Sequence, residues 1–175
     1  MLRAEGTIAA GEFEVVLRSC EFEEPYRKLA AELGVSDLVS FGPHLPYEEA
    51  IREMVSADAL LLFQGRGFNH AVPAKLYEYL YAGRPIFALL DRGGETDNVL
   101  RSLGVDSRAD ITNAQEIAEA LRLFVAQLRA GKVPMPSPEQ VAPYSRRRQA
   151  RRLSGVLEEV LRESAELSPP LAELR

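Results

Sequence analysis

ALLLFQGRGFNHAVPAKLYEYLYAGRPIFALL, residues 59–90, contains two short, fully apolar strands separated by a glycine-bearing loop and a helix. Strands without polar alternation are typical of parallel sheets that are buried on both faces. Ligands of such sheets bind at the loops beyond the carboxyl ends of the strands. The helix carries Lys75 and Glu78 one turn apart. These two charges are therefore candidates for ligand contact.

The same alternation of strand and helix extends through most of the chain. Apolar and β-branched runs predict strands at 13–17, 38–41, 59–63 and 85–90. Helical periodicity with proline starts and glycine stops predicts helices at Pro25–Gly34, Pro46–Val55, Val72–Ala82, Gly94–Gly104, Thr112–Gly131 and 145–166. Thr112 and Gln115 form the pattern of a capping box. The alternation predicts an α/β fold with a Rossmann-like parallel sheet of about five strands and helices on both faces.

The domain organisation follows from the same pattern. We expect a poorly defined N-terminal segment at 1–12 and a Rossmann-like domain at 13–131. A proline-rich stretch at 132–143 lacks periodicity and is interpreted as a connector. The helix at 144–167 is expected to pack on the domain, and 168–175 to form a loose tail.

Composition excludes several classes of function. The chain has 175 residues and a formal net charge of −5, which argues against general nucleic-acid binding. Cys20 is the only cysteine and the two histidines cannot form a typical metal site alone, so neither a metal nor a cofactor is expected. No apolar run approaches the ~20 residues of a membrane span, and residues 1–14 do not resemble a signal peptide. A cytoplasmic protein is the default prediction.

Lys75 and Glu78 allow two interpretations. An i,i+3 pair on a helix forms an ordinary surface ion pair, worth a few tenths of a kcal/mol. Alternatively, the two oxygens of the Glu78 carboxylate are suited to bridge a vicinal diol such as that of a ribose. The spacing alone leaves both interpretations open.

Three loops at predicted strand ends are further candidates, each with a plain structural alternative. The loop before the 72–82 helix places His70 at a helix N-terminus, where it could meet a phosphate or a sugar hydroxyl or could simply face solvent. The stiff loop 42–46 is either a base-reading edge or a plain turn. Gly94 opens a helix that could hold a phosphate or a donor sugar, or forms only a glycine turn. A basic cluster at 146–152 is either a solvated helix face or a contact for anionic lipid head groups.

Taken together, these motifs resemble a known family. A strand ending in VSFGP is followed by a helix with the pattern M-x-x-A-D, the strand ALLLF, a loop, and P-x-K-L-x-E-Y-L-x-A-G-R-P-I. This combination resembles the carboxyl-terminal, nucleotide-sugar-binding domain of retaining glycosyltransferases of the GT-B fold, family 4 (group 1). The resemblance covers about residues 13–164.

The resemblance implies roles for particular residues. It implies that Glu78 binds the ribose hydroxyls and that the loop formed by Gly42, Pro43, His44 and Leu45 lies against the base. It also implies that the backbone around His70, Ala71 and Val72 faces the diphosphate and the donor sugar. The family often has a second glutamate eight residues before the glutamate that binds ribose. At that position this chain has His70. Catalytic residues are not identified.

The resemblance also implies that one strand is missing. The run 13–17 matches the second strand of the family's domain, and residues 1–12 are too short for a first strand, loop and helix. In the order 3-2-1-4-5-6 that strand is central. We therefore expect a sheet that lacks its middle strand. Residues 6–10 could take the place of the missing strand, the remaining strands could pair with each other, or another chain could fill the gap. An open edge would also permit homo-oligomers.

The function expected from the resemblance is that of the donor-binding half of a hexosyltransferase-type enzyme. It would transfer a sugar from a UDP-, GDP- or ADP-sugar to a glycan or a lipid-linked acceptor, as in polysaccharide biosynthesis, in the cytoplasm or at the inner face of the membrane. Without an N-terminal acceptor domain or subunit we expect no activity. The alternatives are a non-catalytic nucleotide-binding or interaction module that pairs with a separate N-terminal subunit, and a GT-B-like enzyme such as a sugar-nucleotide epimerase.

Overall fold

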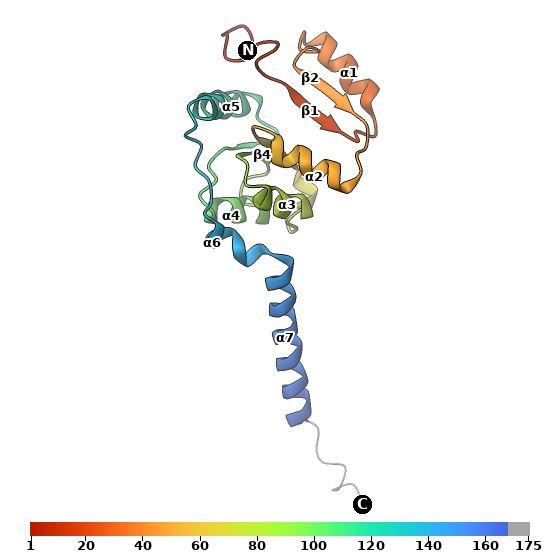
Figure 1. Cartoon of the computed structure of the whole chain (residues 1–175), viewed down its shortest axis with the longest axis vertical. Coiled ribbons are helices and arrows are strands. Elements are labelled where there is room, and N and C mark those ends of the chain that lie inside the picture. The colour runs from red at the N-terminus through yellow and green to blue at the C-terminus, as the bar shows by residue number, and fades with distance from the viewer. Residues whose placement is uncertain (168–175) are drawn as a thin grey trace, which may run out of the picture. The chain divides into compact units, whose positions relative to one another are not determined.

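The computed structural model describes residues 1–167 and shows an α/β protein with parallel strands. The chain forms two compact units, one ending at Met135 and one beginning at Pro136. The predicted loose tail, 168–175, lies outside the described residues. Figure 1 shows the order of the elements along the chain.

Two separate sheets replace the single five-stranded sheet expected from the sequence. In the first, β1 (Val15–Arg18) pairs in parallel with β2 (Val39–Gly42). The second has the order β3-β4-β5, all parallel, with β3 at Leu60–Gln64, β4 at Ile86–Leu90 and β5 at Arg108–Asp110. β1 and β3 form no ladder with each other, so the sheet is divided between them. The division lies at the place where the resemblance implies a missing strand.

The helices of the first unit lie close to their predicted positions. They are α1 (Glu23–Glu32), α2 (Tyr47–Ser56), α3 (Ala74–Ala82), α4 (Glu95–Ser102) and α5 (Ala114–Arg129), with a single turn η1 at Arg66–Phe68. Gly83 ends α3 in the left-handed conformation, at a φ of 63°, which glycine adopts without steric cost. The periodicity therefore predicted the helices well, and their terminal residues differ by one or two positions.

Two local details differ from what the sequence pattern predicts. β5 had not been predicted, because its three residues, Arg108 to Asp110, carry charges at both ends and show no apolar run. The cap of α5 is Asn113 and not Thr112: the Asn113 side chain accepts a hydrogen bond from the Glu116 N–H at 3.1 Å, whereas the Thr112 hydroxyl donates to Asp110.

The connector predicted at 132–143 includes helical turns that the sequence pattern did not indicate. The short helix α6 (Pro138–Val141) starts at a capping box formed by Ser137 and Gln140, and η2 (Ala142–Tyr144) follows it. The second unit ends in α7 (Arg146–Leu167), near its predicted bounds, and its packing on the first unit stays a prediction.

The core of the first unit is centred on β4. This strand is the only one in residues 1–167 that is paired along both edges, and Ala88 and Leu90 are at most 1% exposed. Phe87 packs against Phe124 of α5, with ring centroids 5.2 Å apart. In contrast, the β1–β2 pair is poorly covered: in α1 only Ala30 is buried, while its apolar neighbour Leu33 is 66% exposed.

The N-terminal segment 1–12 forms turns and contributes no strand to either sheet. Ion pairs join it to the rest of the first unit, from Arg3 to Asp37 at 2.5 Å and from Glu5 to Arg122 at 2.6 Å. The side chain of Leu2 is buried. This segment therefore does not substitute for the missing strand.

Candidate functional site

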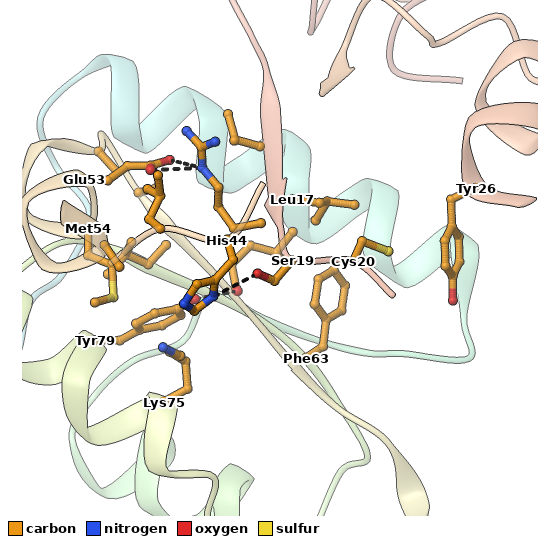
Figure 2. Close-up of a pocket in the computed structure, with 18 residues that line it drawn as sticks. Leu17, Ser19, Cys20, Tyr26, His44, Glu53, Met54, Phe63, Lys75 and Tyr79 are labelled. Carbon is orange, nitrogen blue, oxygen red and sulfur yellow. Dashed lines mark hydrogen bonds and ion pairs between the residues drawn. The ribbon is translucent and has the colours of Figure 1, made fainter. Parts of the chain in front are cut away.

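A cavity of about 830 Å³ lies between the two sheets, where β1 and β3 each present an unpaired edge. Figure 2 shows the side chains that surround it. The ends of three strands contribute to its lining: Ser19 and Cys20 follow β1, His44 follows β2, and Phe63 lies near the end of β3. The cavity therefore lies at the edge of a parallel sheet where ligand sites are usual. Its volume is in the range of small-molecule sites.

The walls of the cavity are mainly apolar. Met54 of α2 and Tyr79 of α3 contribute large side chains, and Leu17 and Leu61 contribute from β1 and β3. Burial raises the pKa of the Tyr79 hydroxyl, and this hydroxyl donates a hydrogen bond of 3.4 Å to the Leu61 carbonyl. Tyr79 thus contributes an apolar ring to the wall of the cavity, with its hydroxyl already hydrogen-bonded.

Polar groups gather where the strands end. Ser19 Oγ lies 3.2 Å from His44 Nδ1, which joins the ends of β1 and β2 (Figure 2). Ser19 also has a φ of 54°, a conformation that is uncommon for residues other than glycine. Lys75 Nζ reaches the cavity from the first turn of α3 and donates to Glu78 Oε2 at 2.7 Å.

Arg18 and Lys75 line the cavity, and each is paired with a carboxylate. The Nε of Arg18 lies 3.0 Å from both oxygens of Glu53 in α2, and Lys75 is paired with Glu78. A bound diphosphate would therefore have to compete with Glu78 for Lys75, or be neutralised by cations other than Arg18 and Lys75. The ion pair expected from the i,i+3 spacing is present, and a role for Glu78 in ribose binding stays a prediction.

The loop after β3 is fixed by hydrogen bonds to its own backbone. The buried side-chain amide of Gln64 donates to the carbonyls of Phe68 and Ala71, at 2.7 and 3.0 Å. Ala71 N–H donates to the Phe68 carbonyl at 3.0 Å, so both backbone groups of this predicted site residue are already used. His70 is exposed beside it.

The start of α4 is also engaged with this loop. The Glu95 N–H donates to the Asn69 carbonyl at 2.8 Å, and the Gly94 N–H lies 3.4 Å from the Asp91 carbonyl. Among the predicted site residues, the structure therefore brings His44 and Lys75 to the cavity and Glu78 to Lys75. His70, Ala71, Val72, Pro43, Gly42 and Gly94 are not among the residues that line it.

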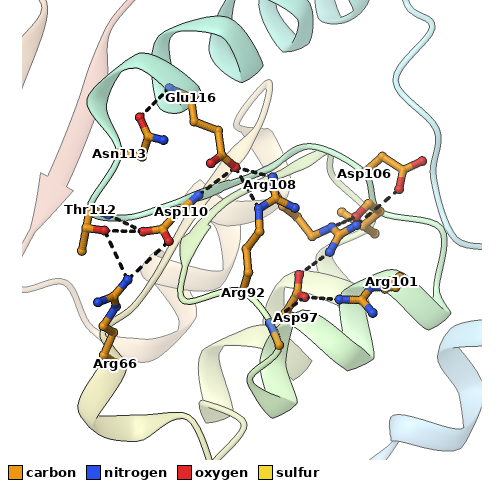
Figure 3. Close-up of polar contacts among 12 residues, drawn as sticks. Arg66, Arg92, Asp97, Arg101, Asp106, Arg108, Asp110, Thr112, Asn113 and Glu116 are labelled. Atoms are coloured by element: carbon orange, nitrogen blue, oxygen red, sulfur yellow. Dashed lines mark hydrogen bonds and ion pairs between the residues drawn. The ribbon is translucent and has the colours of Figure 1, made fainter.

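A cluster of ion pairs fixes the loops after β3, β4 and β5 (Figure 3). Arg66 lies 3.2 Å from Asp91 and 3.6 Å from Asp110. Hydrogen bonds from the Thr112 hydroxyl and N–H, with Arg66 adding a smaller effect, lower the pKa of Asp110. Arg92 pairs with Glu116 of α5.

Asp97 is the buried centre of this region, and sequence reasoning missed it. Its side chain is fully buried and pairs with Arg101 and Arg108, while its Oδ2 accepts a hydrogen bond from the Gly93 N–H at 3.0 Å. Burial alone would raise its pKa, but the Gly93 N–H and the two arginines lower it. The only available signal was the i,i+4 spacing of Asp97 and Arg101 behind the Gly93-Gly94 turn.

No family model, curated protein or solved structure matches this chain. Within residues 1–167, no three histidine, cysteine, aspartate or glutamate side chains are grouped so that they could hold a metal ion. Within the same residues, no helix combines the length and the apolarity needed to cross a bilayer.

Proposed function

We propose that this chain is the nucleotide-sugar-binding domain of a glycosyltransferase. The observation that carries the proposal is the position of His44, Lys75 and Glu78: residues from two different βα units meet beside one cavity at the ends of parallel strands. The motif P-x-K-L-x-E-Y-L-x-A-G-R-P-I supplies two of these three residues. The proposal therefore rests on the motif and on the location of the cavity together.

In the bound complex, Glu78 accepts hydrogen bonds from the ribose hydroxyls, and the loop that includes His44 lies against the base. Lys75 then turns from Glu78 toward the diphosphate, because a diphosphate carries more negative charge than one carboxylate. Only one hydrogen bond, at 2.7 Å on a half-exposed side chain, has to be exchanged for this movement. An exposed pair of this kind is worth well under 1 kcal/mol, so diphosphate binding can offset its loss.

A complete transferase would need residues beyond those described. The domain would fix base, ribose and diphosphate, while an acceptor domain or subunit would bring the attacking hydroxyl. Rate enhancement would come from positioning and from stabilising the charge of the leaving diphosphate. We therefore expect no sugar transfer by this chain alone; detectable turnover of a UDP-, GDP- or ADP-sugar would contradict this expectation.

A second candidate function is a non-catalytic nucleotide-binding module that pairs with a separate subunit. The divided sheet favours it, since β1 and β3 each keep an unpaired edge. The two candidates share the nucleotide site. They differ in whether a complex with the second subunit transfers sugar.

The test of the nucleotide site is a thermal-unfolding panel on the full chain with UDP, GDP, ADP and their sugars. A nucleotide that binds the native state at about 100 times its Kd stabilises the fold by about 2.7 kcal/mol. We expect one nucleotide to raise the Tm of the wild type and of the control Glu119→Ala, an exposed position on α5, but not that of Glu78→Ala. If no nucleotide stabilises the wild type, or if Glu78→Ala responds equally, the proposal is wrong.

A further inference from the structure

The backbone of β1 has hydrogen-bonding groups that point away from its only partner strand. The N–H groups of Val15 and Ser19 donate toward β2, to Leu38 at 2.8 Å and to Gly42 at 3.1 Å. Successive residues of a strand point their backbone groups in opposite directions across the sheet. The N–H and C=O groups of Val16 and Arg18 therefore point to the open edge.

β3 also has backbone groups that point to an open edge. The Leu60 N–H donates to the Pro85 carbonyl, toward β4, at 2.8 Å. The backbone groups of Leu61 and Phe63 therefore point away from β4, and the Tyr79 hydroxyl, at 3.4 Å, contacts only the carbonyl of Leu61. Open edges of this kind are templates for pairing with a further strand.

The two open edges border the same cavity. Val16 and Arg18 line it from β1, and Leu61 and Phe63 line it from β3. Val16 is 43% exposed and Phe63 is 50% exposed, which is unusual for apolar residues of a parallel sheet. Ala50 and Met54 of α2, and Ala57 directly after it, add further apolar surface. The cavity therefore combines unpaired backbone groups with uncovered apolar side chains on two facing edges.

None of the described strands can fill this space. An inserted strand must have two free edges, and each of the five strands is already paired along at least one edge. A second copy would bring such a strand together with its own neighbour strand and helices, which a cavity of about 830 Å³ does not accommodate. The N-terminal segment, 1–12, is held elsewhere by Arg3 and Glu5.

We propose that the cavity receives an extended segment of a partner polypeptide, which pairs with β1 and β3 and completes one continuous sheet. The matching chemistry is a run of about five residues, β-branched and apolar on both faces, because both faces of such a strand are covered. Its carboxyl or amino end would emerge beside Ser19 and His44. The strand would occupy the part of the cavity between β1 and β3, whereas the nucleotide site with His44 and Lys75 lies where the strands end (Figure 2), so this proposal does not depend on nucleotide binding.

The test uses the full chain and a synthetic probe, a peptide with five valine and isoleucine residues flanked by two lysines at each end. Amide hydrogen exchange is followed by NMR. We expect the peptide to slow exchange of the Val16, Arg18, Leu61 and Phe63 amides at least about tenfold and to leave Ala88 of β4 unchanged. The control peptide has proline at the second and fourth core positions, which removes donors and disrupts the strand.

Two variants test whether the peptide protects these amides by binding at the open edge of β3. Phe63→Lys places a charge on the open edge at an exposed position, and Leu123→Lys places the same charge on α5, where Leu123 is 61% exposed. We expect Phe63→Lys to weaken the protection at least about tenfold and Leu123→Lys to leave it unchanged, with Ala88 exchange reporting that both variants are folded.

Four results would overturn the proposal. These are protection of the four amides in the free monomer, absence of protection by the peptide, equal protection by the proline peptide, and protection that appears without peptide as the chain dimerises. The first would mean that β1 and β3 pair with each other or with another part of this chain, and the last that a second copy occupies the edge.

Discussion

Lys75 Nζ donates a hydrogen bond of 2.7 Å to Glu78 Oε2, and of these two residues only Lys75 lines the cavity. The pair therefore holds the carboxylate of Glu78 at the border of the cavity, with its side chain 25% exposed. In the absence of ligand, the two groups neutralise each other. A ligand that attracts Lys75 would leave both Glu78 oxygens able to accept hydrogen bonds from a diol.

We expect Glu78→Gln to separate binding from stability. The exposed i,i+3 pair contributes about 0.5 kcal/mol or less, so the Tm should fall by about 1–2 °C. The Tm increase caused by the preferred nucleotide should be lost, because a neutral amide accepts hydrogen bonds from a diol less strongly than a carboxylate. Calorimetry with and without nucleotide measures both. A large drop in Tm without ligand would show that the pair is structural.

We expect Asp97→Asn to destabilise the fold strongly. The fully buried carboxylate pairs with Arg108, whose side chain is only 9% exposed, and its loss leaves that guanidinium buried without its main partner. Breaking such a pair costs about 3 kcal/mol. The matched control is Asp106→Asn, which removes an 82% exposed partner of Arg108 and should cost under about 0.5 kcal/mol. Urea denaturation gives both values, and similar values for the two variants would contradict the prediction.

We expect the protonation of Asp97 to contribute to the loss of stability at low pH. Its folded-state pKa lies below the ordinary value of 3.8, so in acid the unfolded chain binds its proton first. The contribution of Asp97 is therefore complete above about pH 5 and is lost as the pH falls through 3.8 toward the lower folded-state pKa. Denaturation midpoints between pH 6 and pH 3 should fall less steeply in Asp97→Asn than in the wild type. An identical slope would contradict this assignment.

Substitutions of Ser19 test whether its backbone conformation matters for stability at the polar end of the cavity. At its φ of 54°, a β-branched side chain meets the backbone, so Ser19→Val should cost about 2 kcal/mol. Ser19→Gly removes the same contact with His44 but tolerates the conformation, and should change stability by about 0.5 kcal/mol or less. Guanidinium denaturation compares the two variants. Equal effects would mean that the hydroxyl, and not the backbone conformation, decides stability at this position.

Much of the local structure could be predicted from patterns of neighbouring residues. The apolar runs of β1 to β4 and the glycine stops at positions such as Gly83 act over a few residues, so they are visible in the sequence. β5 has no such run, and it forms because β4 already offers a ladder to Ala109 and Asp110. Asp97 was missed for the same reason: its partner Arg108 lies on the other side of a turn, and only the fold brings them together.

The sequence by itself determined the α/β class, the order of the helices and the pairing of Lys75 with Glu78, because each depends on residues at most a few turns apart. The resemblance predicted a gap in the sheet, and only the tertiary structure decided that the strands do not pair again across it and that a cavity lies along the open edges of β1 and β3. Strand pairing joins residues that are far apart in the chain, so the pattern within each strand does not show whether β1 and β3 pair with each other. His44 and Lys75 meet at this cavity for the same physical reason.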